Sequence, residues 1–93
     1  MRITFDPAKD AWNRQHRGFG FDYVALIFAG RTVERQDTRR DYGEVRINAL
    51  GEIEGRIFHV TYTHRGADGL HIISARVAKR KERRAWLRSL PRP

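Results

Sequence analysis

The sequence contains no cysteine, few prolines and no long apolar segment. Without cysteine, neither a disulfide framework nor a thiolate metal site can hold the fold together. No apolar run approaches the roughly 18 residues that a membrane-spanning helix needs. The first residues, Met-Arg-Ile-Thr-Phe-Asp-Pro, also reach an acid before a signal-type apolar region could form. We therefore expect a soluble, cytoplasmic protein that is held together by packing and secondary structure.

Motifs for metal, phosphate-loop and serine-hydrolase chemistry are also missing. The sequence has no His-Glu-x-x-His string and no EF-hand loop, and its four histidines are scattered. Gly18 and Gly20 lack the flanking strand and the further glycine of a dinucleotide loop. Ser74 falls within an expected strand and has no nucleophile elbow around it. Any catalysis is therefore expected to need neither a metal ion nor a cofactor.

Basic residues outnumber acidic ones, and the excess lies near the C-terminus. The formal net charge is +8: residues 1–75 contain 11 Lys or Arg against 10 Asp or Glu, whereas residues 76–93 contain 8 against 1. Arginine outnumbers lysine 16 to 3, which genomic base composition could explain, and basic tails are often only solvated. Base composition does not explain the asymmetry, however. The distribution favours a polyanionic partner such as nucleic acid, an anionic membrane surface or an acidic protein.

The first third of the sequence predicts two helices. Asp6 followed by Pro7 is typical of a helix N-cap and first helical position, so a helix is expected from Pro7 to about His16. Glycines at 18 and 20 end it. Apolar residues at helical spacing then predict a second, core-facing helix from Phe21 to Phe28.

After Gly30 the pattern changes to a period of two, which predicts strands separated by turns. The expected strands are Arg2–Phe5, Thr32–Gln36, Glu44–Leu50, Arg56–Thr63 and Leu70–Val77. Turns are expected at Gly51–Gly55 and His64–Gly69. From Ala78 onward, strong helix formers predict a basic C-terminal helix with Ala78, Ala85 and Trp86 on its buried side.

Together these elements predict an α+β fold in a single domain that spans residues 1–93. Its layout is an N-terminal strand, two helices, a four-stranded antiparallel meander and the basic helix. Residues 88–93 are expected to form a loose tail.

Three polar residues of the first helix share one stripe. Lys9, Asn13 and His16 lie at positions i, i+4 and i+7, so they could together contact a phosphate, ribose or base. An ordinary solvent-exposed face is the alternative interpretation, and the spacing alone favours it.

Charged residues also recur on the expected sheet. Glu44 and Arg46 point to the same face of their strand, and Arg76 closes the last strand, so a carboxylate and two guanidinium groups could meet there. A simple cross-strand ion pair remains an equal alternative. Alternation places His59 and Tyr62 on opposite faces of one strand, with Tyr62 in the core beside Phe58 and Val60.

Several short strings occur in a specific order. The most specific is Ile-Ile-Ser-Ala-Arg at residues 72–76, which leads into the arginine-rich helix. The accompanying residues are Phe5-Asp6, Lys9, Asn13, His16, Gly18, Phe21-Asp22, Ala25 to Phe28, Gly43-Glu44, Arg46, Gly55-Arg56, Val60, Tyr62-Thr63, Ala78, Glu82-Arg83 and Trp86. In this order they resemble the BrnT toxins of bacterial type II toxin–antitoxin systems, which share the compact fold of the RelE-like ribonucleases. The sequence departs from the family in having Arg17 between His16 and Gly18, and in having tryptophan where tyrosine is usual at 86.

The resemblance implies an endoribonuclease toxin that cleaves RNA and so inhibits translation and growth. It also implies a cognate antitoxin of the BrnA-like, ribbon-helix-helix type, operator DNA contacted only through that antitoxin, and no membrane partner.

Cleavage by an attacking 2′-hydroxyl needs a base, cations that stabilise the phosphate, and an acid for the leaving 5′-oxygen. We expect Arg46, Arg76 and Lys79 to be the cations and Glu44 or His16 to be the base. The expected RNA-positioning residues are Lys9, Asn13, Arg80 and Arg83. Two alternatives are a non-catalytic nucleic-acid binder and an adaptor whose basic helix docks on an acidic partner.

Overall fold

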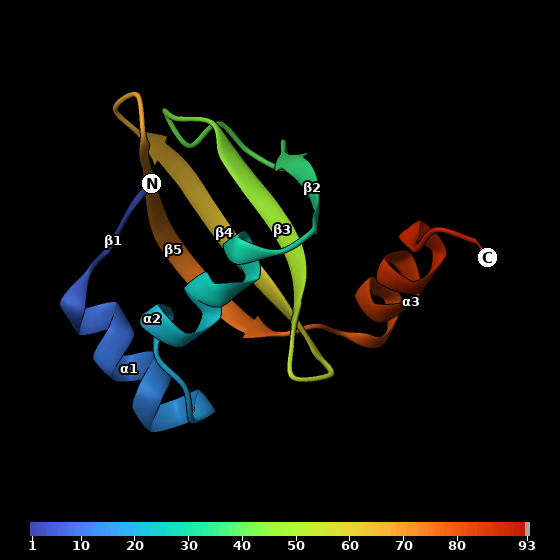
Figure 1. The fold of residues 1–93 in the computed structure, drawn as a ribbon. Helices are drawn as coiled ribbons and strands as arrows, with labels where there is room; N and C mark the ends of the chain where they lie inside the picture. Colours follow the sequence, from blue (N-terminus) through green and yellow to red (C-terminus); the bar gives the residue numbers. More distant parts are fainter. Residues whose placement is uncertain (93) are drawn as a thin grey trace.

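The computed structural model describes residues 1–92, which form one sheet, three α-helices and one 3₁₀ helix (Figure 1). In chain order the elements are β1 (Arg2–Phe5), α1 (Pro7–Arg17), α2 (Phe21–Val24), the 3₁₀ helix η1 (Ala25–Ala29), β2 (Thr32–Asp37), β3 (Arg46–Ile53), β4 (Arg56–Arg65), β5 (Gly69–Val77) and α3 (Arg80–Ser89). The strand order is β1-β5-β4-β3-β2, in which β1 runs parallel to β5 and the other neighbours are antiparallel. The predicted α+β class is confirmed, with a mixed five-stranded sheet.

Helix α1 begins at the predicted residue. The side chain of Asp6 accepts a hydrogen bond of 2.8 Å from the backbone N–H of Ala8, and Pro7 occupies the first turn. Gly18 ends the helix in the left-handed conformation, with φ at 84°, which glycine adopts without a steric penalty. The helix extends one residue beyond the expected end at His16.

The second predicted helix, Phe21–Phe28, is divided into α2 and η1. Ala25 and Phe28, which helical spacing predicted on the core-facing side with Phe21 and Val24, are only partly buried, and the buried residues are Phe21, Val24 and Ile27. These three residues are spaced by three, which matches the three residues per turn of a 3₁₀ helix as well as one face of an α-helix. The apolar pattern therefore located the segment but not its helical type.

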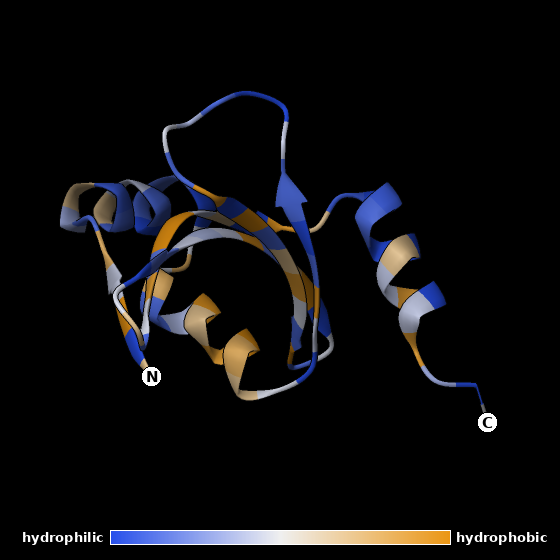
Figure 2. Cartoon of the chain, turned by 90° about the horizontal axis from the view of Figure 1, so that it is seen from above, coloured by the Kyte–Doolittle hydropathy of each residue, from blue (hydrophilic) through white to orange (hydrophobic). Residues whose placement is uncertain are grey.

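The sheet curves around α2 and η1, and its concave face is the core side (Figure 2). Phe58, Val60 and Tyr62 of β4 point toward these helices and are almost fully buried, as their alternation predicted. The rings of Phe28 and Tyr62 meet edge to face with centroids 5.2 Å apart. Because the helices α1, α2 and η1 cover this side, the opposite side of the sheet, named the outer face here, is left for polar residues.

Strand β3 and its hairpin with β4 correct two sequence predictions. Strand β3 starts at Arg46 instead of Glu44, and it continues through Gly51, where a turn was expected, to Ile53. Ile53 pairs with Arg56, so the turn consists of Glu54 and Gly55 alone. Both turn residues have positive φ, 52° and 83°, as a two-residue type I′ hairpin requires.

Helix α3 packs on the outer face at one end only. Ala78 and Trp86 form a small apolar cluster with Leu50 and Ile57, with Ala85 partly buried beside it. This is the buried side that the sequence predicted for the helix.

Arg31 fastens the far end of α3 to the rest of the fold. Its guanidinium carbon lies 4.3 Å from the ring centroid of Trp86, and its Nη1 donates to the Ser89 hydroxyl at 3.1 Å. Residues 88 and 89 of the predicted loose tail at 88–93 belong to α3, and its last residue, Pro93, lies outside the described part. None of the helices in residues 1–92 has the length and apolar character that crossing a membrane would require.

Candidate functional site

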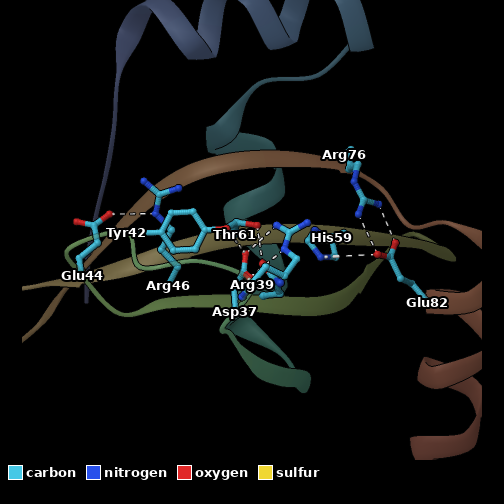
Figure 3. A network of polar contacts seen from close by, with 10 residues as sticks. Asp37, Arg39, Tyr42, Glu44, Arg46, His59, Thr61, Arg76 and Glu82 are labelled. Carbon is cyan, nitrogen blue, oxygen red and sulfur yellow. Dashed lines mark hydrogen bonds and ion pairs between the residues drawn. The ribbon is translucent and has the colours of Figure 1, made fainter.

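Polar side chains form rows across the outer face of the sheet. Strand alternation and register bring Leu50, His59 and Arg76 into one row, and Arg35, Asn48, Thr61 and Ser74 into the next. The Thr61 hydroxyl donates to the side-chain oxygen of Asn48 at 2.7 Å, which links β4 to β3. The outer face therefore presents fixed polar groups on several strands (Figure 3).

Arg76 and Glu82 form the best-defined ion pair of this face. Nη1 of Arg76 donates to Oε1 of Glu82 at 2.7 Å, and Nη2 donates to Oε2 at 2.8 Å. Oε1 of Glu82 also accepts the backbone N–H of Lys79 at 2.7 Å, so it caps the start of α3. The hydrogen bonds from Arg76 lower the pKa of Glu82 to about 2, so this carboxylate is ionised at neutral pH. A two-pronged contact of this kind fixes both side chains at the junction of β5 and α3.

His59 lies beside this pair on the neighbouring strand. Its Nε2 is 3.7 Å from Oε2 of Glu82, and its register partner on β5 is Arg76. Burial is the main reason that the pKa of His59 is lowered, and the positive charge of Arg76 lowers it further against the opposing effect of Glu82. The imidazole is therefore neutral at pH 7 and can accept a proton.

A cleft of about 230 Å³ opens between the outer face and α3. Its sheet wall includes Arg35, Asn48 and His59, and its helix wall includes Lys81 and Glu82. A neutral imidazole, an ionised carboxylate and cationic side chains thus surround one concave space. This combination can hold an anionic substrate and move a proton.

The loop between β2 and β3 supplies a second polar cluster. The buried carboxylate of Asp37 accepts two hydrogen bonds from the Arg39 guanidinium, at 2.9 and 2.8 Å, and one from the Tyr42 hydroxyl at 3.1 Å. These hydrogen bonds, above all those from Arg39, hold the pKa of Asp37 far below its usual range. The guanidinium carbon of Arg46 lies 4.1 Å from the Tyr42 ring centroid, and its Nε donates to Glu44 at 3.2 Å. The cluster therefore fixes Arg46 on the outer face.

A groove beside α1 joins three of the expected positions. Lys9 and Asn13 of α1 line it together with Arg46 of the sheet. Asn13 is buried, however, and its amide nitrogen donates to the Phe19 carbonyl at 2.9 Å while its oxygen accepts from Arg17 at 3.2 Å. Asn13 therefore fastens the helix end, and the expectation that it binds RNA is not supported by its contacts.

The remaining expected residues are not gathered at one point. His16 stacks on the ring of Trp12, with its Nδ1 2.9 Å from the Trp12 carbonyl oxygen. Lys79 precedes α3, and Arg80 is exposed on its first turn. Arg83 donates to the Ala78 carbonyl at 2.8 Å and lines a separate hollow with Trp86. His16 and Arg83 therefore do not line the cleft at His59.

The described residues 1–92 contain no group of three or more His, Cys, Asp or Glu side chains arranged to hold a metal ion. Glu82, the carboxylate of the cleft, instead pairs with Arg76 and lies 3.7 Å from His59.

The model of a protein family described as the ribonuclease toxin BrnT of type II toxin–antitoxin systems matches residues 5–82. The chain belongs to the BrnT family. The crystal structure of the ribonuclease toxin BrnT of Brucella abortus is similar, with 26% sequence identity and a TM-score of 0.62. That match covers 86% of this chain and 99% of the Brucella chain. A search of curated proteins gives no significant match.

Membership of the BrnT family confirms the resemblance found in the sequence. It makes the chain a member of a family of ribonuclease toxins, for which RNA is the substrate class and an antitoxin is the partner.

In this BrnT-family chain, two residues at the centre of the cleft were not predicted from the sequence. Neither His59 nor Glu82 was expected at the site, although both flank Arg76, which was expected. The strand register that sets His59 beside Arg76 could have indicated the histidine once the β4–β5 hairpin was predicted. No pattern in the sequence indicated that Glu82 turns back onto Arg76, since this depends on how α3 leaves the sheet.

Proposed function

We propose that the chain is a metal-independent endoribonuclease toxin that cleaves RNA in the cleft between the outer face and α3. The observation that carries the proposal is the neutral His59 beside the Arg76–Glu82 pair in a cationic cleft. The finer features also belong to this proposal: a RelE-like, single-domain fold over residues 1–93, action in the cytoplasm, inhibition of translation, and neutralisation by a ribbon-helix-helix antitoxin that binds operator DNA.

His59 is the proposed general base in place of Glu44 or His16. Its ring accepts the proton of the attacking 2′-hydroxyl as the new bond from the 2′-oxygen to phosphorus forms. Glu44 is paired with Arg46, and His16 is held on Trp12, so both are less suited to this step. Lys81, on the opposite wall, is the candidate donor of a proton to the leaving 5′-oxygen. The products are a 2′,3′-cyclic phosphate and a 5′-hydroxyl end.

Arg76 retains its proposed role as a phosphate-stabilising cation. Its contact with Glu82 uses one N–H of each terminal nitrogen, and a guanidinium has five N–H groups in all. Arg46 and Arg35 extend positive charge along the outer face, where the flanking phosphates would lie. Glu82 holds Arg76 in place and favours the imidazolium that forms at His59 during the reaction.

The test is cleavage of an unstructured single-stranded RNA in excess EDTA. We expect the parent protein to cleave, His59→Gln to lose about 10²- to 10⁴-fold in rate, and Arg76→Ala to lose about 10²- to 10³-fold. His64→Gln, an exposed histidine of the same strand, and Arg56→Ala, on the helix-covered side of the sheet, are matched controls expected to resemble the parent.

Equal cleavage by His59→Gln and the parent would remove His59 from the mechanism. Binding of RNA without cleavage, in the presence or absence of ribosomes, would favour the non-catalytic nucleic-acid binder instead. In cells, expression of the parent should arrest growth, and the antitoxin or the His59→Gln substitution should relieve the arrest.

A further inference from the structure

Trp12 on α1 exposes an unusually large aromatic surface. About half of this residue, 48%, is accessible to solvent, and the other exposed large apolar residues of the described chain are aliphatic. An indole ring left at the surface gains free energy when another flat apolar surface covers it. Trp12 therefore has the properties of a contact residue and makes little contribution to the core.

Contacts within the protein hold the indole ring in one orientation. The ring of His16 stacks on it with centroids 4.3 Å apart and an angle of 16° between planes. The guanidinium carbon of Arg17 lies 5.0 Å from the ring centroid, and Nη1 of Arg17 is itself anchored at 2.8 Å to the Ala75 carbonyl. A ring that is already ordered loses little conformational entropy when it binds a ligand.

Cationic groups surround the groove that Trp12 lines. The groove has a volume of about 380 Å³ and is bordered by Lys9, Trp12 and Arg17 of α1 and by Arg46, Ile73 and Ser74 of the sheet. The groove thus combines an aromatic ring with three cationic side chains. A nucleotide presents the matching pair of features, a flat base and a phosphate.

Residues that border the groove lie on the same strand and the same sheet face as residues of the proposed cleavage site. Arg46 lies on the outer face, and Ser74 is two residues before Arg76 on the same strand, which corresponds to about 7 Å along β5. Consecutive stacked nucleotides advance by about 3.4 Å each. A single RNA strand can therefore extend from Arg76 to Ser74, at the border of the groove, within about two nucleotides.

We propose that Trp12 is a base-stacking subsite for an unpaired nucleotide that flanks the cleaved phosphate. Lys9, Arg17 and Arg46 contact the phosphate of this nucleotide, and His16 supports the indole from one side. Because every base has a flat face, the subsite accepts all four bases but requires that the base be unpaired. The inference rests on the proposed cleavage of RNA at His59 and adds the strand's path and its single-stranded state.

Binding and cleavage are measured separately to test the subsite. The probe is a 2′-O-methyl oligoribonucleotide of about eight nucleotides, which binds but cannot be cut because its 2′-oxygen is blocked. We expect Trp12→Ala to weaken binding by between about 5-fold and about 150-fold, whereas Trp12→Phe, which keeps a stacking ring, stays close to the parent. Leu26→Ala removes a similarly exposed apolar side chain from η1 and is expected to bind as the parent does.

Fluorescence gives an independent measurement. The chain has two tryptophans, so Trp86→Phe leaves Trp12 as the only indole, and the oligonucleotide should quench its emission. If Trp86→Phe does not fold, the difference between the parent and Trp12→Phe reports the same signal. An oligonucleotide of equal length that lacks bases should bind the parent and Trp12→Ala equally.

Unchanged affinity in Trp12→Ala, or an equal loss of affinity for the abasic strand, would overturn the subsite. A duplex whose binding depends on Trp12 as strongly as that of the single strand would also overturn it. Quenching and Trp12-dependent binding by a parent that cuts no RNA would contradict the proposed function but leave the subsite standing. Cleavage by the parent, with oligonucleotide binding that does not depend on Trp12, would support the proposed function but contradict the subsite.

Discussion

At the scale of single residues, Arg76 interacts with two neighbours, Glu82 and His59. It holds Glu82 through two hydrogen bonds, and its charge contributes to the lowered pKa of His59 on the adjacent strand. The same guanidinium therefore positions a carboxylate and, after burial, is the next cause that keeps the proposed base unprotonated. A substitution at Arg76 should change the pH dependence of cleavage as well as its rate.

The pH–rate profile provides a test of this coupling. The activity of a neutral base is lost as the pH falls through its pKa, so kcat/KM should rise with pH and level off at an apparent pKa below 6.5. Arg76→Gln removes a positive charge that lowers the pKa of His59 and keeps the Glu82 charge that raises it. The rising limb of the profile should therefore move to higher pH.

The profile is measured with one RNA substrate from about pH 4.5 to about pH 8. Arg56→Ala serves as the control, and its limb should coincide with that of the parent. A limb that stays in place, or that moves to lower pH, in Arg76→Gln would contradict the assignment of His59 as the base.

The sequence identified single residues where a local pattern sufficed. Glu44, Arg46 and Arg76 were expected to be able to meet on one sheet face. The structure joins Glu44 and Arg46 by an ion pair of 3.2 Å, whereas Arg76 pairs with Glu82 instead. The contact of Asn13 with the Phe19 carbonyl was not predicted, because spacing along α1 cannot tell a solvent-facing amide from a buried one. Glu82 was missed because its partner lies across the turn between β5 and α3.

Gly51 illustrates the constraints at the scale of elements. It was taken as a turn residue, but it lies within β3, where η1 passes close to the strand. A Cβ atom on Gly51 would collide with the side chain of Ile27. The position requires glycine because of close packing, since its φ is not among the positive values of the chain.

Gly51→Ala should therefore destabilise the fold by about 1–3 kcal/mol, because the added methyl group overpacks the contact between β3 and η1. Gly30→Ala is the matched control: no atom lies within 4 Å of an added Cβ there, and a change within about 0.5 kcal/mol is expected. Urea unfolding of both variants measures the difference. Equal stabilities would show that η1 can shift without cost.

The extents of most strands followed from alternation, but their arrangement did not. Alternation and turn residues predicted the segments that became β1, β2, β4 and β5 to within two residues at each end. The pairing of β1 with β5 could not be predicted, because no local pattern specifies which edge of a sheet a short strand joins. Because the glycine at 51 was taken as the start of the turn, the shorter type I′ turn at Glu54 and Gly55 was not predicted.

At the scale of the whole molecule, the charge asymmetry along the chain becomes part of a cationic surface, which we propose binds RNA. The basic C-terminal segment includes one wall of the cleft, while Arg35 and Arg46 continue the positive charge across strands that the sequence showed as nearly neutral overall. Net charge along the chain predicted a polyanionic partner. It could not predict this surface, which depends on how the sheet brings distant arginines together.

Salt dependence measures how many phosphates this surface contacts. For single strands, the slope of log K against log salt concentration is about −0.7 per neutralised phosphate. Arg35→Ala should make the slope for the 2′-O-methyl oligonucleotide shallower by about 0.7, whereas Arg56→Ala should not change it. Equal slopes for the parent and Arg35→Ala would exclude Arg35 from the strand's path.

The parallel pairing of β1 with β5 affects how the toxin is made. Thr4 and His71, whose side chains meet at 2.8 Å, are 67 positions apart. During synthesis β1 and α1 leave the ribosome well before β5, so the sheet and the groove beside α1 cannot be completed on a partial chain. A nascent chain that ends before β5 therefore lacks both the sheet edge that β1 joins and the sheet residues Ile73 and Ser74 of the groove.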